Sequence, residues 1–200
     1  MGILGHLKTV TRHRALVLKH CVMAGIPLSG LTHDLSKFSP TEFLPGARYY
    51  EQGKRSPNEH EREVLGYSAA WMHHKGRNRH HWEYWFDINP ASRRYEPVPM
   101  PVKYLKESFC DRVAASKIYK GEQYRDSDAL DYMISKKEME SLMHPCTACI
   151  LRKWLTMLAG EGEEKTFAYL RRVGDIRCHP QRCPKCAART DITFRETTVD

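Results

Sequence analysis

The sequence predicts an all-α fold, in which one main domain is followed by a short Cys-rich tail. Apolar residues recur with helical spacing through most of the chain, and glycine and proline divide it into segments of helix length. No convincing strand pattern occurs before residue 190. Two hundred residues can form one compact core with a small appendage. We therefore expect a helical bundle at residues 1–173 and a tail at residues 174–200.

Composition and charge limit the classes of protein that we consider. No apolar run approaches ~20 residues, so no membrane-spanning helix and no membrane partner are expected. The N-terminus lacks the basic-then-apolar pattern of a signal peptide, and the seven cysteines then indicate thiols or metal ligands in a reducing compartment, the cytoplasm. The net charge of +8 favours anionic partners such as nucleotides, nucleic acid or other phosphate esters, although solubility alone explains it equally well.

The first predicted helix spans residues 3–24 and carries three histidines. They are spaced by seven residues and therefore lie along one face of the helix: His6, His13 and His20. Val10 and Val17 fall on the same face, which indicates that it points towards the interior. A single histidine on such a face is usually a hydrogen-bonded core residue, but three together favour a polar site.

A second, short helix is predicted at residues 28–36 and includes a His-Asp pair. His33 offers a neutral nitrogen ligand, Asp34 an anionic oxygen ligand, and Lys37 a cation three residues later. These groups are the ones needed to hold a divalent metal and to orient a phosphate beside it. Because the dipeptide also occurs by chance, its significance depends on further ligands elsewhere in the chain.

Two helix starts follow, each with a Ser-Pro pair. Ser39 is a predicted N-cap, and Glu42 would complete a capping box. The second start opens a helix predicted over residues 56–75, which carries His73 and His74 in its last turn.

Residues 76–101 are predicted to be irregular, because four prolines prevent a long helix. Helical periodicity returns at residues 102–119, with one apolar face and one small, polar face that contains Asp111. A lone inward-facing aspartate is costly unless it is paired or metal-bound. Three more helices are predicted: residues 127–142, 145–159 and 163–173.

The inward-facing polar candidates lie on different helices in the order H…HD…HH…D: His13 or His20, His33-Asp34, His73-His74 and Asp111. This order resembles that of the HD-domain metal-dependent phosphohydrolases. Residues 13–17 (HRALV) look like the H-x-x-x-V start of the first ligand helix, and residues 33–37 (HDLSK) are similar to the H-D-x-x-K element. Residues 110–115 (CDRVAA) resemble the aspartate-bearing last ligand helix, and His73-His74 resembles the double histidine of the binuclear branch.

The chain more closely resembles a family of short, uncharacterised phage and bacterial proteins related to that superfamily. The shared words include HDLSKFSPTEF at residues 33–43 and AWMHHKGRNRHHWEYW at residues 70–85. The gap between His13 and the His-Asp pair is short for the superfamily, which leaves the choice between His13 and His20 open. The Gly-Tyr-Pro element is absent, so cleavage of cyclic dinucleotides is not implied.

The resemblance implies an HD-domain-like bundle that holds one or two divalent metal ions. The expected metal ligands are His13, His33, Asp34, His73, His74 and Asp111, with His6 and His20 as alternative or supporting residues. Mixed imidazole and carboxylate ligands suit Mn, Fe, Co, Ni or Zn better than Mg or Ca. Such an ion lowers the pKa of bound water from ~16 towards ~7. We expect Asp34 and Lys37 to be catalytic, and the expected substrate-binding residues are Lys37, Arg77, Arg79, His80 and His81.

The tail contains a C-P-x-C turn, Cys183 to Cys186, which is typical of a zinc knuckle. The C-x-x-C pair Cys146 and Cys149 is a candidate partner, so the sequence predicts a structural zinc that attaches the tail to the main domain. The alternative is a loose tail with spare thiols.

The first functional hypothesis is a metal-dependent phosphohydrolase that acts on a nucleotide or other phosphate ester. The second is a di-iron oxygenase, because some HD-type bundles hold two iron ions. The third is a non-enzymatic module that binds nucleic acid or protein through its positive charge.

Overall fold

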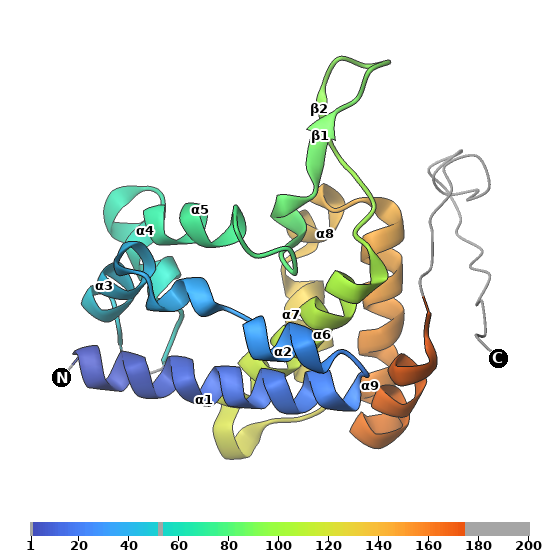
Figure 1. Ribbon diagram of the computed structural model, residues 1–200, viewed down its shortest axis with the longest axis horizontal. Helices are drawn as coiled ribbons and strands as arrows, with labels where there is room; N and C mark the ends of the chain where they lie inside the picture. Colours follow the sequence, from blue (N-terminus) through green and yellow to red (C-terminus); the bar gives the residue numbers. More distant parts are fainter. Residues whose placement is uncertain (1, 52–53, 175–200) are drawn as a thin grey trace.

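The computed structural model describes residues 2–51 and 54–174, and this part of the chain is mainly helical. The all-α prediction is confirmed (Figure 1). The α-helices are α1 (Gly2–Met23), α2 (Pro27–Thr32), α3 (Pro40–Arg48), α4 (Pro57–Leu65), α5 (Ala69–Lys75), α6 (Val102–Lys120), α7 (Asp128–Ser135), α8 (Lys137–Leu142) and α9 (Pro145–Arg172). The shorter elements are the 3₁₀ helices η1 (Leu35–Phe38), η2 (Trp82–Tyr84) and η3 (Gly121–Gln123), and the strands β1 (Phe86–Ile88) and β2 (Tyr95–Pro97). Among the described residues, each helix is too short or too polar to cross a membrane.

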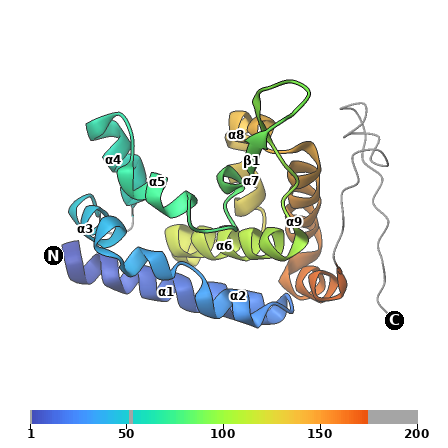
Figure 2. The ribbon, with the colours of Figure 1, turned by 45° about the horizontal axis from the view of Figure 1, so that its top comes forward.

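Helix α6 lies at the centre of the fold and packs against α1, α7 and α9 (Figure 2). Its apolar face is fully buried, and Phe109 makes edge-to-face ring contacts with Trp154 at 6.3 Å and Phe167 at 5.7 Å, both from α9. Such pairs add to the stabilisation that comes from burying apolar area. The core therefore fixes α6 firmly, and with it the polar residues on the opposite face of that helix.

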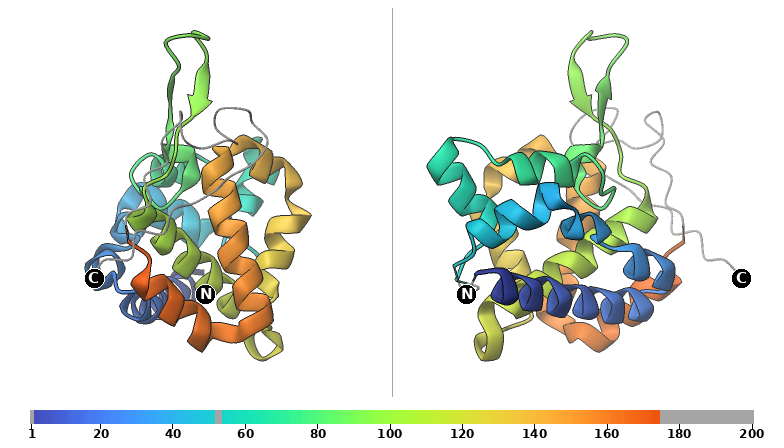
Figure 3. Two further views of the ribbon diagram at one scale, coloured as in Figure 1. Left: turned by 90° about the vertical axis from the view of Figure 1, so that its right-hand side faces the viewer. Right: turned by 60° about the vertical axis from the view of Figure 1, so that its left-hand side comes forward.

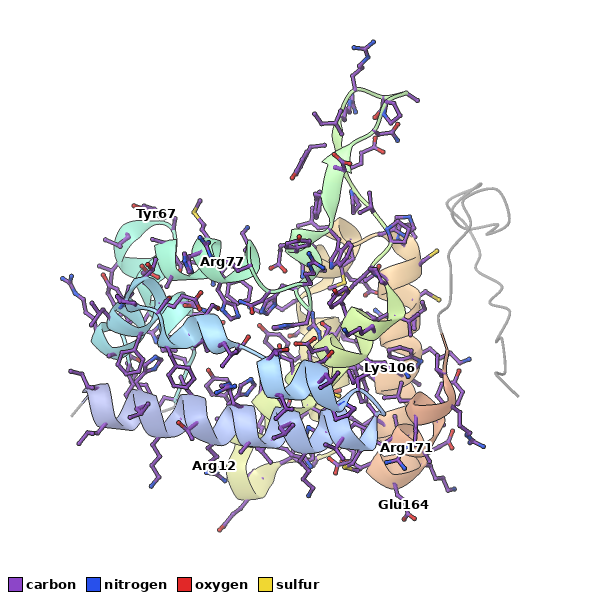
Figure 4. All side chains as sticks on the ribbon, viewed as in Figure 1. Arg12, Tyr67, Arg77, Lys106, Glu164 and Arg171 are labelled. Atoms are coloured by element: carbon purple, nitrogen blue, oxygen red, sulfur yellow. The ribbon has the colours of Figure 1, made fainter. Side chains whose placement is uncertain are left out.

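A second layer lies above α1 in Figure 1. Helix α3 packs against both α1 and α5, and α4 packs against α3. Side chains from α1 below and α5 above project into the space between the two helices (Figure 4). Five of the six expected metal ligands meet in this space, namely His13, His33, Asp34, His74 and Asp111.

Two predicted helices are divided in the structure. The helix expected over residues 56–75 is α4 and α5, because Gly66 adopts the left-handed conformation at φ 79° and ends α4. Ser68 then caps α5 by accepting a hydrogen bond from the Trp71 backbone N–H at 3.0 Å. The helix expected over residues 127–142 is likewise two helices, α7 and α8, separated at Lys136, which has non-helical backbone angles. The two helices expected over residues 145–159 and 163–173 are the two parts of α9, which are separated by a kink at Gly162, where φ 81° and ψ 174° are not helical.

The strands β1 and β2 form an antiparallel hairpin that projects from the helices (Figures 1 and 3). Phe86 pairs with Pro97 and Ile88 with Tyr95. The expectation that no strand precedes residue 190 was therefore wrong. Strands of three residues are too short for the alternation of apolar and polar residues that reveals a strand in a sequence.

The predicted tail from residue 175 onwards, with the candidate zinc ligands Cys183 and Cys186, lies outside the described residues. Their expected partners, Cys146 and Cys149, lie in the first two turns of α9, and Cys146 is buried. The structural zinc stays a prediction.

Candidate metal centre

The His-Asp pair occupies a turn and not the helix that was expected at residues 28–36. Helix α2 ends at Thr32, and Asp34 adopts a left-handed backbone conformation at φ 53° and ψ 27°. Aspartate tolerates this conformation better than most residues. Arg14 on α1 holds the turn by donating to the His33 carbonyl at 2.7 Å and to the Leu31 carbonyl at 3.1 Å. Both side chains of the pair are thereby directed inward, and only 1% of His33 and 2% of Asp34 is exposed.

The first group of candidate ligands brings together α1, the His-Asp turn and α6. His13 Nε2 lies 3.0 Å from Asp111 Oδ1, and His33 Nε2 lies 3.6 Å from the same oxygen. His33 Nε2 also lies 3.4 Å from Asp34 Oδ2. The structure thus brings together four of the six expected metal ligands.

The second group shares Asp34 with the first. Asp34 Oδ1 lies 3.2 Å from His74 Nε2 on α5 and 3.4 Å from His80 Nε2, while Asp34 Oδ2 faces His33. His81 completes this group, in which the donor atoms all lie within 4.8 Å of one another. The two oxygens of one carboxylate therefore face two different sets of imidazoles.

His80 and His81 were expected to bind phosphate, and His73 was expected to bind metal beside His74. In the structure His73 lies outside both groups, with its Nδ1 2.6 Å from Glu42 Oε1. Successive residues of an α-helix point about 100° apart, and of these two histidines on α5 it is His74 whose Nε2 reaches Asp34. His80 and His81 follow the helix in a non-helical turn, which allows both imidazoles to reach the same place.

Two glutamates that the sequence analysis missed orient these imidazoles. Glu107 Oε1 lies 3.0 Å from His33 Nδ1 and 3.1 Å from His80 Nδ1, so one oxygen serves a histidine of each group. Glu42 Oε2 lies 2.7 Å from His74 Nδ1. A proton on Nδ1 that is donated to a carboxylate leaves Nε2 as a free acceptor, the form in which histidine binds metal.

The sequence contained a signal for each glutamate. Glu107 precedes Asp111 by four residues and thus lies on the same face of α6. Glu42 matched a capping box, but the Ser39 side chain makes no cap hydrogen bond in the structure, and Glu42 turns inward instead.

The donor atoms of the two groups are better placed to bind metal ions than to form hydrogen bonds with one another. Several are buried and have no hydrogen-bond partner within the described part of the chain, namely the Nε2 atoms of His33, His74, His80 and His81 and Oδ1 of Asp34. When Nδ1 carries the proton, Nε2 and a carboxylate oxygen are two acceptors facing each other, and this arrangement requires a cation between them. Donor atoms lie within 4.8 Å of one another in three overlapping sets: His13, His33 and Asp34; His33, His80 and Asp111; and Asp34, His74, His80 and His81. This spacing matches an ion that makes bonds of ~2.0–2.2 Å to each ligand. The residues therefore fit one or two divalent transition-metal ions.

The charges of the site show the same need for a cation. Burial by itself would lower the pKa of His33, but Asp34, Asp111 and Glu107 outweigh burial and raise this pKa to about 10. Burial opposes ionisation of Asp34 and Asp111, yet the neighbouring histidines hold the pKa of both carboxyls well below the usual range. Without metal, a proton on His33 takes the place of the cation.

The other two histidines of α1 lie away from the centre. His20 stacks on Phe167 at a ring distance of 5.3 Å, and its Nδ1 lies 3.4 Å from the Cys110 carbonyl oxygen. His6 packs against Phe43 and against α3. Burial lowers the pKa of each to about 4, so both are neutral at pH 7. Of the three histidines, His13 is the one that the structure places at the centre.

The centre opens into a cavity of about 570 Å³. Lys37 lies in it, with Nζ 3.5 Å from Asp34 Oδ2, and the pKa of Lys37 is raised because the attraction of Asp34 outweighs burial. Of the expected phosphate-binding arginines, Arg77 is exposed (Figure 4) and Arg79 donates to the Tyr104 hydroxyl at 3.0 Å. Neither lines the cavity, whereas Arg62 and Arg112 do.

A family model described as a family of unknown function, DUF5662, matches residues 2–157. The chain belongs to this family. The match includes all the residues of both ligand groups, as well as Glu42 and Glu107. No curated protein and no solved structure matches the chain.

The match to DUF5662 ends at residue 157, within α9. The matched span therefore contains the whole candidate metal centre. It excludes the predicted zinc ligands of the tail.

Proposed function

We propose that this protein is a metal-dependent phosphohydrolase that acts on a phosphate ester with the help of two divalent transition-metal ions. The observation that carries this proposal is the position of Asp34 between two groups of buried imidazoles. His13, His33 and Asp111 would hold one ion with Asp34, and His74, His80 and His81 would hold the other. The resemblance of the motifs to those of HD-domain phosphohydrolases supports the same reaction. Mn, Fe, Co, Ni and Zn are the candidate ions.

The charge of the cavity supports an anionic substrate. Acidic and basic side chains line it in equal number: Asp34, Glu42, Glu59, Glu83, Asp111 and Asp128 against Lys37, Lys54, Arg55, Arg62, Arg112 and Lys120. Two divalent cations would make the cavity strongly positive, and a positive cleft concentrates anions.

Each part of the site has a defined task in this reaction. Bound divalent ions lower the pKa of water and offset the negative charge of phosphoryl oxygens. Asp34 would be a ligand of both ions, and Glu42 and Glu107 hold the imidazoles in the orientation that binds metal. Lys37 stays protonated beside Asp34 and would hold a phosphate oxygen there.

The test combines metal analysis of protein purified without chelator with a screen of phosphate esters and nucleotides. We expect two ions per chain and metal-dependent release of phosphate. Asp34→Asn should lose both ions and all hydrolysis, whereas Asp111→Asn and His81→Gln should each lose one ion. His73→Gln is the matched control, since it removes an adjacent imidazole that lies outside both groups.

Other outcomes would replace the proposal. Full activity of Asp34→Asn would contradict it. Bound iron with O₂ uptake and no phosphate release would indicate the di-iron oxygenase. Salt-sensitive nucleic-acid binding that survives His33→Ala and Asp34→Ala, without any hydrolysis, would indicate a non-enzymatic module.

A further inference from the structure

Arg112 is a cavity residue with an enclosed side-chain nitrogen that has no hydrogen-bond partner among the described residues. It follows Asp111 on α6, is half-buried and lines the cavity. Its Nε is enclosed and has no hydrogen-bond partner, and no ion pair joins it to a carboxylate in residues 2–51 or 54–174. Enclosing a cation is costly unless an anion or a set of acceptors compensates for the lost water.

Arg62 reaches the same cavity from α4. Its guanidinium lies 5.6 Å from the centre of the Trp71 ring, and Trp71 lies 4.7 Å from the His81 ring. Arg62 is exposed, and it has no ion pair with a carboxylate among the described residues. Arg62 therefore lies on the side of the centre where the second ligand group is located.

Glu83 forms no ion pair with either arginine among the described residues. It is largely buried, lines the cavity, and has an enclosed Oε2 without a hydrogen-bond partner. Arg112 and Arg62 therefore line the cavity near the metal centre without a carboxylate partner among the described residues.

We propose that Arg112 and Arg62 bind a second anionic group of the substrate, so that the substrate carries a phosphate or carboxylate in addition to the phosphate at the metal centre. This inference rests on the proposed function and names its substrate class. A guanidinium matches either anion with two parallel N–H donors. The cavity, at about 570 Å³, is larger than one phosphate requires and lies in the range of sites for drug-sized ligands.

Helix geometry explains why the second group is separate from the first. Arg112 and Asp111 are consecutive residues of α6, so their side chains leave the helix about 100° apart. Asp111 faces His13 and His33, and Arg112 therefore faces a different part of the cavity. Lys37 is the cation that lies at the metal centre itself.

The experiment uses metal-loaded protein and ligands without a hydrolysable bond. Binding of propylphosphonate is compared with that of 3-phosphonopropionate, and butylphosphonate with 4-phosphonobutyrate, by calorimetry. Within each pair a carboxylate replaces a methyl group, and the two pairs differ in the distance between the anionic groups. The variants are Arg112→Gln and Arg62→Gln, and Arg77→Gln is the control because Arg77 lies outside the cavity.

We expect the added carboxylate to tighten binding by about tenfold in the wild type for at least one pair, consistent with charged hydrogen bonds. Arg112→Gln should abolish this gain and leave the affinity for the simple alkylphosphonate within about twofold. Arg62→Gln should reduce the gain, and Arg77→Gln should keep it.

Two results would overturn the inference. In one, the carboxylate does not tighten binding to the wild type; in the other, Arg112→Gln weakens binding of both ligands of a pair by the same factor. The second result would place Arg112 on the phosphate at the metal. If Arg112→Gln loses metal or helical content, Arg112→Lys and Arg62→Gln decide the question. If the carboxylate tightens binding but no ester is hydrolysed, the anion subsite is upheld and the phosphohydrolase is rejected. If esters are hydrolysed but the carboxylate does not tighten binding, the phosphohydrolase is upheld and the subsite is rejected.

Discussion

Among single residues, the site depends on carboxylates that each serve two or three imidazoles. Asp34 faces both ligand groups, Glu107 binds one histidine of each, and Glu42 binds His73 and His74. A change at one of these positions therefore affects more than one contact.

Glu107→Gln tests this coupling between the groups. The amide removes the charge that holds His33 and His80 in the binding tautomer, so both ions should bind about 10–100-fold more weakly. Competition with a coloured chelator would measure the two affinities. Glu42 contacts one candidate metal ligand, His74, so Glu42→Gln should weaken binding of one ion more than that of the other. Equal metal affinities in Glu107→Gln and the wild type would contradict the coupling.

The buried His20 should make the fold sensitive to acid. Its pKa is about 4 in the folded chain because of burial, and 6.5 is the ordinary value. Between these pH values the unfolded chain binds more protons, so stability is complete above pH 6.5 and falls as the pH drops towards 4.

His20→Gln measures this contribution. Between about pH 7 and 5, the free energy of unfolding of the wild type should fall by about 2 kcal/mol more than that of the variant. Denaturant unfolding with chelator present separates this effect from metal binding. An identical pH dependence in both proteins would show that His20 does not titrate in this way.

Among the helices, the point at which α2 and α5 end determines where several of the site's side chains lie. Helix α2 ends before the His-Asp pair, and α5 ends before His80 and His81. Helix α6, in contrast, runs through the site and presents Glu107 and Asp111 from one face.

The kink in α9 gives a clean test of backbone conformation. Gly162 has φ 81° and ψ 174°, a region that is essentially restricted to glycine. A Cβ there would meet its nearest atom, Asp126 Oδ2, at 3.6 Å, so the strain would come from the backbone and not from a clash. Gly162→Ala should cost about 1–3 kcal/mol in thermal or chemical unfolding.

Gly160→Ala is the matched control two residues earlier in the same helix. A Cβ at Gly160 meets nothing within 4 Å, and the position is helical. Alanine should stabilise the protein by about 0.5–1 kcal/mol there. Equal changes in the free energy of unfolding for the two substitutions would contradict a strained backbone conformation at position 162.

At the scale of the whole molecule, the metal centre joins parts of the chain that are far apart in sequence. Its residues come from α1, the His-Asp turn, α5 with the turn after it, and α6. Ions bound there would hold the two layers of helices together.

Removal of metal should therefore lower the melting temperature. A ligand that binds the folded state alone stabilises it by about 2.7 kcal/mol at 100 times its dissociation constant. Differential scanning fluorimetry with and without chelator would show the change, and Asp34→Asn should melt at one temperature in both conditions. A wild-type melting temperature that stays constant while bound metal is removed would contradict this prediction.

Much of the fold was predictable because helix signals are local. The bounds expected for α1 and α6 differ from the observed ones by a residue, since the apolar period and a glycine after each helix define them. The division at Gly66 and the hairpin were missed. A left-handed glycine can end a helix without interrupting the apolar pattern, and three-residue strands show no pattern.

The sequence by itself determined the helical class of the fold and proposed His33, Asp34 and Asp111 as partners, because residue type and helical spacing are local properties. The tertiary structure decided that His13 and not His20 lies at the centre, and that His80 and His81, with His74, form the second group. It also brought Glu42 and Glu107 behind the imidazoles and Arg112 into the cavity. These choices depend on where each helix ends and on which neighbour its face meets, and no single segment contains that information.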